Sequence, residues 1–203
     1  AATINELLHK VDAISLDKGI KKQIIIVNDF SKDNSKDEIE KFISETKNKE
    51  GIVFIDHKNN IGKGGAIKSA LQKANGDYTV IQDADLELNP NEINNLLQPV
   101  LDDKADVVYG SRFINNKKQK KESILNRIAN VFLTGFGNLI FGVKLTDMQT
   151  CYKLIPTSVF KSLLLIENRF AFDPEVTAKL AKNKKLRWKE VAISYNPRTK
   201  DEG

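Results

Sequence analysis

The order of its apolar segments constrains the fold of this chain more than any other feature. Short apolar runs typical of buried strands alternate with stretches whose apolar residues recur at helical spacing. The expected strands cover residues 23–27, 52–55, 78–82 and 105–109, and the expected helices cover residues 4–14, 35–47, 66–74 and 91–101. This alternation predicts an α/β fold with a mostly parallel central sheet and helices on both of its faces.

The second half of the chain is less regular but carries the same two signals. Helices are expected at residues 123–136, 157–165 and 174–182, a short strand within 146–155, and a further strand within 186–195. No Ser/Gly/Pro-rich linker interrupts the 203 residues, so we expect a single domain over residues 1–203. Ligands of such sheets bind beyond the carboxyl ends of the strands, where polar residues are therefore the first candidates for a site.

Cysteine and histidine are too scarce for several common kinds of site. The single Cys151 excludes an internal disulfide and a zinc-binding cysteine cluster, which fits a reducing compartment. The only histidines are His9 and His57, so the composition does not favour a histidine metal site or a catalytic triad. We expect both histidines at the surface or at its boundary.

The net charge of +5 includes lysine clusters at residues 117–121 and 182–185. Solvated loops and helix faces explain the second cluster, and attraction to phosphates or to an anionic membrane is the alternative reading. Aromatic residues are not interleaved with the basic ones, so nucleic acid is not an expected partner. No signal peptide or bilayer-spanning apolar run is visible. Polar residues interrupt the segment 128–145, which is expected to form an internal helix or, alternatively, a face apposed to a membrane.

Two carboxylates one residue apart, Asp83 and Asp85, directly follow the expected strand 78–82. Residues i and i+2 of a strand share a side, so both carboxylates can reach one hard cation. Such a cation would bridge phosphate oxygens and neutralise charge on a departing diphosphate. Glu87 is a candidate third ligand, direct or through water. The spacing alone is common and usually marks a turn, so the surrounding segments decide between the two readings.

Two more loops follow expected strands. A carboxylate at Asp29 could accept a hydrogen bond from a nucleobase, although an Asx turn with a helix cap explains this turn equally well. Residues 60–66 (NIGKGGA) open a helix, and their N–H groups and Lys63 could face phosphate oxygens. These residues lack the spacing of a P-loop, and close helix packing explains their glycines about as well. Arg112, Arg127 and Arg198 are candidates for a second phosphate, each with a surface salt bridge as the alternative.

Seven segments, taken together and in order, resemble the family 2 glycosyltransferases of GT-A fold. The likeness is greatest to the polyprenyl-phosphate branch that includes dolichyl-phosphate mannose and glucose synthases. The matching segments are residues 26–33 (IVNDFSKD), 60–66 (NIGKGGA), 76–87 (GDYTVIQDADLE), 107–112 (VVYGSR), 146–153 (TDMQTCYK), 170–175 (FAFDPE) and 190–199 (EVAISYNPRT). They extend over essentially the whole chain.

The resemblance implies a Rossmann-like GT-A fold, inversion at the anomeric carbon, and particular roles for particular residues. The nucleotide-sugar donor, a UDP- or GDP-hexose, would contact Asn28, Asp29, Ser31, Lys63, Gly64, Asp83, Ala84 and Gln149, with Asp29 reading the base. Mg²⁺ or Mn²⁺ on the diphosphate would be surrounded by Asp83, Asp85 and Glu87. The catalytic residues would be Asp85, Asp147 and Arg112, and the phosphate of a polyprenyl phosphate acceptor would be held by Arg112, Arg127 and Arg198. Asp147 and Gln149 would lie near the donor sugar, and the enzyme would be peripheral at the cytoplasmic face of a membrane.

The chemistry of the acceptor favours a phosphate. A phosphate monoester has a second pKa of about 6 and can attack as a dianion without a general base. A sugar hydroxyl would need a base, for which Asp147 is the best candidate. A polysaccharide synthase that acts on hydroxyls is therefore the alternative reading. A nucleotide-sugar-binding module without catalysis is a second, and a nucleotidyltransferase and a HAD-type phosphohydrolase have less support.

The chain departs from the family pattern in three places. Asn28 stands where the family usually has an aspartate, and Phe30 stands where it usually has glycine. The family also begins with a nucleoside-binding strand, and the sequence starts just after it, so we expect this strand either to precede the given residues or to be missing. Members of the family often carry membrane helices or an amphipathic tail after the last matching segment, and the given residues include neither.

Overall fold

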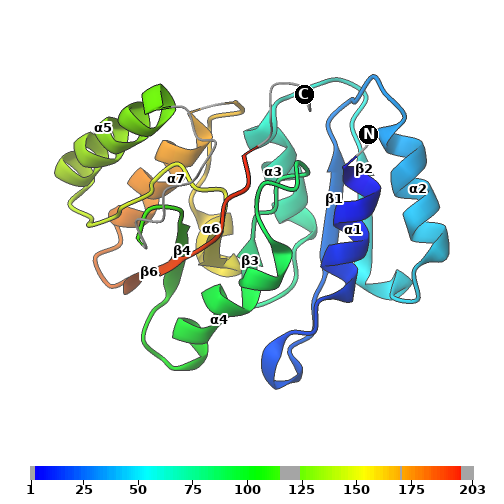
Figure 1. The fold of residues 1–203 in the computed structure, drawn as a ribbon, viewed down its shortest axis with the longest axis horizontal. Helices are drawn as coiled ribbons and strands as arrows, with labels where there is room; N and C mark the ends of the chain where they lie inside the picture. The colour runs from blue at the N-terminus through cyan, green and yellow to red at the C-terminus, as the bar shows by residue number, and fades with distance from the viewer. Residues whose placement is uncertain (1–2, 115–123, 170, 198–203) are drawn as a thin grey trace.

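The computed structural model describes residues 3–114, 124–169 and 171–197 as an α/β structure (Figure 1). Its helices are α1 (Ile4–Ala13), α2 (Ser35–Glu45), α3 (Lys63–Lys73), α4 (Ile93–Leu101), α5 (Ile124–Phe141), α6 (Thr157–Ser162) and α7 (Phe172–Ala181). Its strands are β1 (Ile24–Asn28), β2 (Ile52–Asp56), β3 (Tyr78–Val80), β4 (Val107–Ser111), β5 (Lys153–Pro156) and β6 (Trp188–Ala192). Short 3-10 turns cover Asp17–Gly19 (η1), Lys49–Gly51 (η2) and Pro90–Glu92 (η3). The α/β class and the order of elements expected from the sequence are confirmed.

The described strands form two sheets. β1 and β2 are parallel, with Ile24 opposite Ile52. The second sheet has the order β3-β5-β4-β6, in which β4 and β6 are parallel and β5 is antiparallel to both β3 and β4. The parallel pairs agree with the expected sheet, whereas β5 makes the four-stranded sheet mixed.

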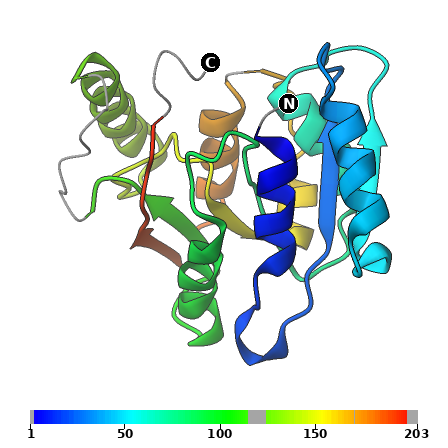
Figure 2. The ribbon, with the colours of Figure 1, turned by 45° about the vertical axis from the view of Figure 1, so that its right-hand side comes forward.

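Helices cover both faces of each sheet, as Figures 1 and 2 show. α4 packs on one face of the four-stranded sheet with Leu96 and Val108 in its core. α3, α6 and α7 pack on the other face around Tyr109 and Val176. Adjacent β4 residues therefore serve opposite cores, because successive side chains of a strand point to opposite faces. α1 and α2 cover the β1–β2 sheet around Phe42, and α3 also contacts β1, so it joins the two sheets.

In the described part of the chain, no helix has both the length and the hydropathy needed to cross a bilayer. The longest of the described helices is α5, with 18 residues. It lies at the edge of the molecule in both views (Figures 1 and 2). Its C-terminal half packs against α7 and against the loop that leads to β5.

Candidate active site

Most of the predicted site residues lie at the carboxyl ends of the strands, as expected for an α/β sheet. Asn28 ends β1 and is followed by Asp29, Asp83 lies just beyond β3, and Arg112 directly follows β4. Arg127 belongs to α5, but its side chain lies outside the described residues, as does the whole of Arg198. Their predicted roles therefore stay predictions.

A chain of alternating charges connects the end of β3 with the first turns of α3 and α7. The Lys63 ammonium, on the first residue of α3, lies 2.8 Å from Asp83 Oδ2 and 4.0 Å from Asp173 Oδ2. The other oxygen of Asp173 accepts a hydrogen bond from Lys153 Nζ. Two carboxylates and two ammonium groups, from four separate segments, are thus gathered at one place.

The buried Lys153 side chain holds Asp173 of this cluster in place. The side chain is fully buried, and its ammonium donates to Asp173 and to the Thr150 carbonyl and lies 5.2 Å from the centre of the Tyr109 ring. A buried ammonium is tolerated only when it is paired and hydrogen-bonded, and these contacts meet that requirement. Asp173 is therefore held in a fixed position, and through it the Lys63 ammonium is placed.

The charge state of the cluster follows from its neighbours. Burial works to lower the pKa of Lys63, but its charged neighbours, Asp83 and Asp173 among them, outweigh burial and raise that pKa. Burial is also the main reason why the pKa of the Cys151 thiol is raised well above its ordinary value, with the charge of Asp83 adding to it. Cys151 is therefore a neutral thiol at neutral pH, and the charged partners of the Lys63 ammonium are Asp83 and Asp173.

The two carboxylates of the Asp83-Ala84-Asp85 motif are partly exposed, but Glu87 does not join them. Asp85 Oδ1 accepts the backbone N–H of Glu87 at 3.1 Å, and Glu87 lines a cavity of about 390 Å³ together with Lys10 and Asn196. Among the residues that the structure describes, no three His, Cys, Asp or Glu side chains are gathered as a metal site. The three predicted carboxylates are therefore not gathered around one point in this structure, and the role of Glu87 as a cation ligand stays a prediction.

A divalent cation nevertheless fits the two aspartates. Mg²⁺ is commonly bound by one or two carboxylates, with substrate phosphates and water completing its coordination. The side chain of Asp83 is 34% exposed, so an incoming cation can reach it. Lys63 already places a cationic group against Asp83 Oδ2, which shows that this oxygen faces a position suited to positive charge.

Arg112 and Asp147 form a second charged site, beyond β4. Arg112 Nε and Nη2 donate to the two oxygens of Asp147 at 2.7 and 2.9 Å, and the Arg112 backbone N–H donates at 3.1 Å. Asp147 is fully buried, and the guanidinium lies 5.1 Å from the centre of the Tyr195 ring. Glu190 accepts the Asp147 backbone N–H at 3.1 Å. The predicted catalytic pair is thus brought together, with Asp147 fixing the orientation of the guanidinium.

Asp29 holds the glycine-rich loop rather than pointing away from it. Its oxygens accept the backbone N–H groups of Ile61 at 3.0 Å and Gly62 at 2.7 Å, and His57 Nδ1 lies 2.9 Å from Oδ1. The other ring nitrogen of His57 lies 2.9 Å from Ser69 Oγ, on α3. His57 lies at the boundary of the protein, as expected: its side chain is 14% exposed and connects the end of β2 with α3 and the end of β1.

The glycines of this loop are explained by close packing. Gly62 has a φ of +90°, and a Cβ there would lie 2.4 Å from the Asn168 carbonyl oxygen. A Cβ at Gly64 would lie 2.5 Å from the Glu167 carbonyl oxygen. Only glycine allows the loop to approach the segment before α7 this closely. Packing, the alternative to phosphate binding, thus accounts for both glycines, while Lys63 between them remains directed at Asp83.

Asn28 and its neighbours form the turn after β1. The Asn28 side chain is buried, donates to Asp56 Oδ1 at 2.8 Å and accepts the Ser31 N–H at 3.2 Å. Phe30, which replaces the usual glycine, adopts a φ of 62° and is 47% exposed. The Asn28 side chain therefore closes this turn, and the exposed tip of the turn is an aromatic ring.

The charged pairs of the site join segments far apart in sequence, and two of their members were not predicted. Lys153 and Asp173 belong to segments that match the family pattern, which was the available signal for them. His57 had no such signal.

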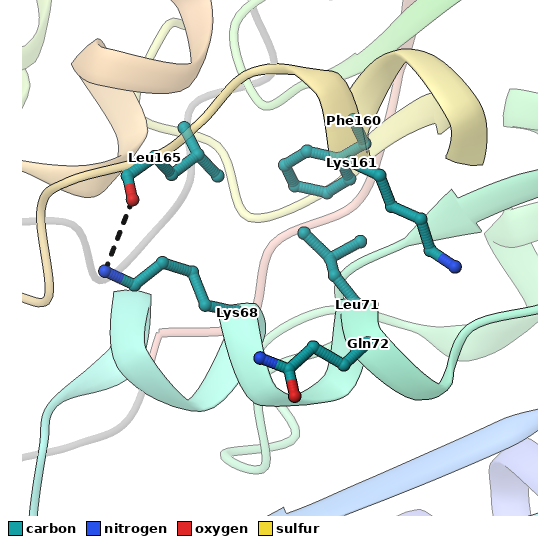
Figure 3. Close-up of a pocket in the computed structure, with 6 residues that line it drawn as sticks. All are labelled: Lys68, Leu71, Gln72, Phe160, Lys161 and Leu165. Atoms are coloured by element: carbon teal, nitrogen blue, oxygen red, sulfur yellow. Dashed lines mark hydrogen bonds between the residues drawn. The ribbon is translucent and has the colours of Figure 1, made fainter.

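A separate cavity of about 350 Å³ between α3 and α6 is lined by residues that include Lys68, Leu71 and Phe160 (Figure 3). None of the predicted site residues lines it.

The hydrogen bonds of Asp29 predict a pH-dependent stability. Burial works to raise the pKa of Asp29, but the hydrogen bonds from Ile61, His57 and Gly62 outweigh it and hold that pKa below its ordinary value of 3.8. A carboxyl group whose pKa is lowered in the native state stabilises the fold at pH values above its ordinary pKa. This stabilisation is lost as the pH falls through the native pKa. Asp29→Asn is therefore expected to cost about 2 kcal/mol in the free energy of unfolding at pH 7. This difference from the wild type should shrink below pH 4 or so.

Urea unfolding of both proteins at pH 7 and at pH 3 measures this difference. The exposed Asp37 is the control, because replacing it by asparagine is expected to change the free energy of unfolding by less than about 0.5 kcal/mol. A difference between wild type and Asp29→Asn that is the same at both pH values would contradict the account.

Comparison with known proteins identifies the family. The family model "Glycosyl transferase family 2" matches residues 1–164. The chain is 28% identical over 188 residues to a dolichyl-phosphate beta-glucosyltransferase of Trichomonas vaginalis. This match covers 86% of this chain and 54% of that protein. It is 32% identical over 147 residues to a UDP-N-acetylglucosamine–dolichyl-phosphate N-acetylglucosaminyltransferase of Methanococcus voltae, covering 70% of this chain and 58% of that protein. The chain thus spans little more than half the length of these two relatives.

Two further likenesses bear on the fold and on the acceptor. The poly-beta-1,6-N-acetyl-D-glucosamine synthase of Staphylococcus aureus is 28% identical over 200 residues, covering 96% of this chain and 45% of that protein. Glucosyl-3-phosphoglycerate synthase of Mycobacterium tuberculosis, crystallised with Mn²⁺, UDP and phosphoglyceric acid, shares the fold with a TM-score of 0.68 at 14% identity. That match covers 99% of this chain and 68% of the other, so the GT-A fold expected from the sequence is confirmed. The protein belongs to glycosyl transferase family 2.

Proposed function

We propose that the protein transfers a hexosyl group, with inversion, from a nucleotide-sugar donor to a polyprenyl phosphate. The observation that carries this proposal is the cluster of Asp83, Lys63 and Asp173 beyond β3, beside the partly exposed Asp85. Two relatives act on dolichyl phosphate according to their names, which supports a lipid phosphate acceptor. The reaction would take place at the cytoplasmic face of a membrane.

The donor diphosphate would lie against the cluster. Asp83 and Asp85 would hold a divalent cation, Mg²⁺ or Mn²⁺, which would neutralise the charge of the departing nucleoside diphosphate. A related fold has been crystallised with Mn²⁺ and UDP, which supports a divalent cation in this position. Lys63 adds a positive charge at the N-terminus of α3, an end of a helix that favours anions.

The geometry around Asp147 favours a phosphate acceptor over a hydroxyl. Both Asp147 oxygens already accept hydrogen bonds from Arg112, so this bidentate pair would have to open before Asp147 could approach an acceptor hydroxyl. A phosphate dianion needs no base, only a positive group to position it. Arg112 would provide that group, with its orientation fixed by Asp147. Arg127 and Arg198 would be further acceptor-phosphate ligands, and Gln149 would lie near the sugar.

A hydroxyl acceptor is the second candidate function. It is favoured by the similarity over 96% of the chain to a synthase of a polysaccharide, poly-beta-1,6-N-acetyl-D-glucosamine. In that reaction Asp147 would have to accept a proton, and Arg112 would have to release it first. A donor-binding protein without transfer would retain the cluster but release no nucleoside diphosphate.

Release of nucleoside diphosphate tests the reaction class. The protein is mixed with Mn²⁺ and a panel of UDP- and GDP-sugars, with polyprenyl phosphate, with the matching polyprenol, or with no acceptor. We expect release from one donor that depends on the phosphate of the lipid. Release that is equally fast with the polyprenol would contradict a phosphate acceptor, and release of inorganic diphosphate from a nucleoside triphosphate would indicate a nucleotidyltransferase.

Lys63→Met is expected to weaken donor binding. Without the ammonium, the KM for the nucleotide sugar should rise about tenfold, the effect of one lost charge-assisted contact. Since Lys63 also neutralises Asp83 in the free protein, the affinity of the free protein for Mn²⁺ should increase rather than fall. Steady-state kinetics and Mn²⁺ titration measure the two effects. Lys73→Met, at the exposed last residue of the same helix, is the control and should change neither.

A further inference from the structure

The amphipathic pattern of α5 is the reverse of that of an ordinary surface helix: polar side chains of α5 face the rest of the protein. Thr134 is buried, and its hydroxyl accepts the Met148 backbone N–H at 3.2 Å. The Asn138 side chain donates to the Leu145 carbonyl at 2.7 Å and accepts the Leu145 N–H at 3.0 Å. Gly137 lies on the same side, where a Cβ would meet the Met148 side chain at 2.4 Å. The polar and small residues that interrupt the apolar sequence are thus the ones that attach the helix to the rest of the protein.

The outer face of the same helix is apolar and exposed. Its large apolar side chains with high exposure are Ile128, Val131, Phe132, Leu133, Phe136, Leu139 and Ile140. Leu139 is 82% exposed and Phe132 is 70% exposed. The rings of Phe132 and Phe136, one turn apart, are nearly parallel with their centres 6.4 Å apart. A contiguous apolar face of this kind marks an interaction surface, because water-soluble helices normally turn that face inward.

The charges around this face are basic. Residues 124–145 contain no Asp or Glu, and their only charged residues are Arg127 and Lys144. Lys144 is exposed, and a Cβ at Gly142 would lie 3.7 Å from Lys184 Nζ, so the Lys184 ammonium lies at the C-terminal end of α5. Lys182 and Lys185 are exposed beside it. An apolar helix face with a basic rim complements the hydrocarbon and the anionic headgroups of a membrane surface.

We infer that the outer face of α5 docks on the surface of an anionic bilayer, with the helix lying in the plane of the interface. At 1.5 Å per residue, the helix presents about 27 Å of such surface. Its inner face is fixed to the protein by Thr134 and Asn138, and it packs against α7, whose first turn holds Asp173 of the donor cluster. Docking through α5 would therefore keep the donor site beside the lipid that carries the acceptor. This inference rests on the proposed function only for the identity of that acceptor.

Co-sedimentation with vesicles tests the docking surface. The protein is mixed with phosphatidylcholine vesicles, with and without phosphatidylglycerol. We expect binding that increases with the anionic lipid, and a double variant Phe132→Asn, Leu139→Gln that binds about thirtyfold more weakly. The control is Leu164→Gln, Ile166→Gln, which alters two equally exposed apolar residues (81% and 76%) between α6 and α7. Equal binding by all three proteins, or equal loss in both variants, would overturn the assignment to α5.

Two further measurements separate this inference from its alternatives. Light scattering reports whether α5 pairs with a second copy; a wild-type dimer that the α5 variant makes monomeric, without vesicle binding, would overturn the inference. Transfer is then compared between long-chain polyprenyl phosphate in vesicles and a short, water-soluble isoprenyl phosphate. The α5 variant should lose transfer to the first and retain transfer to the second. No transfer by the wild type to either acceptor, with vesicle binding intact, would overturn the proposed function but leave the docking surface standing.

Discussion

Asp83→Asn is expected to lower sugar transfer at least about a hundredfold while leaving the fold intact. The substitution keeps the shape of the side chain but removes the charge that would hold a divalent cation on the donor diphosphate. Cations in such sites contribute several kcal/mol to the stabilisation of the transition state, and each 1.36 kcal/mol corresponds to a factor of ten in rate. The stability should change little, because the Lys63–Asp83 pair is about one third exposed on both sides.

The measurement is the rate of nucleoside diphosphate release at saturating Mn²⁺, together with the affinity of the protein for Mn²⁺ in the presence of the nucleoside diphosphate. Asp77→Asn is the matched control, since Asp77 is an exposed carboxylate just before β3. It should retain wild-type activity. Asp85→Asn should behave like Asp83→Asn, because asparagine keeps the Oδ1 that accepts the Glu87 N–H and loses only the charge. Near-normal turnover in Asp83→Asn would contradict a catalytic cation site at Asp83.

Asp147→Asn is expected to destabilise the fold strongly. Asp147 is fully buried and accepts three hydrogen bonds from Arg112, whose side chain is only 12% exposed. Removing one partner of a buried pair leaves the other charge uncompensated, at a cost of about 3–5 kcal/mol. For a chain of this size such a loss lowers Tm by about 10 °C. Transfer should also fall in the folded variant, because the guanidinium loses its fixed orientation.

Thermal unfolding followed by circular dichroism measures the effect on stability. Asp106→Asn is the control, because Asp106 pairs with Arg187 in a bidentate geometry that is similar but partly exposed. An exposed pair contributes at most about 1 kcal/mol, so Tm should fall by only a few degrees. Equal falls in Tm for the two variants would show that the burial of the Arg112–Asp147 pair does not determine its contribution.

The positions of the site residues along the chain were predictable, whereas their pairing was not. Strand–helix alternation placed Asp83 and Arg112 at strand ends, and the structure confirms both positions. The pairs themselves join residues 20 and 35 positions apart, as in Lys63–Asp83 and Arg112–Asp147. Such pairings depend on how helices and loops pack over the sheet, and no local spacing encodes them.

The contacts that the sequence did not reveal have physical explanations. His57 lies at the boundary of the protein, as expected, but the sequence did not show that it follows β2 between Asp29 and Ser69, where both ring nitrogens have partners. Glu87, the candidate third ligand, lies two residues beyond Asp85. However, Leu86 adopts a φ of 61°, so the chain turns between Asp85 and Glu87 and the alternation of a strand no longer holds. The antiparallel direction of β5 likewise could not be predicted, because the periodicity of side chains does not report the direction of a strand in its sheet.

α5 shows most clearly what the sequence left open. The polar residues within segment 128–145 indicated that the apolar run was interrupted, and both an internal helix and a membrane-apposed face were consistent with that pattern. Only the hydrogen bonds of Thr134 and Asn138 show which side of the helix faces the protein. The same sequence with the opposite face inward would have been an ordinary core helix.

Isolation of the lipid product tests the central claim most directly. The protein is incubated with its preferred nucleotide sugar, Mn²⁺ and polyprenyl phosphate, and the lipid is analysed by mass spectrometry and by NMR of the anomeric centre. The account predicts one hexosyl residue joined to the lipid through the phosphate, with its anomeric configuration opposite to that of the donor, and no such product with Asp83→Asn. A sugar–sugar linkage formed on a hydroxyl acceptor, with the lipid phosphate left unmodified, would contradict it.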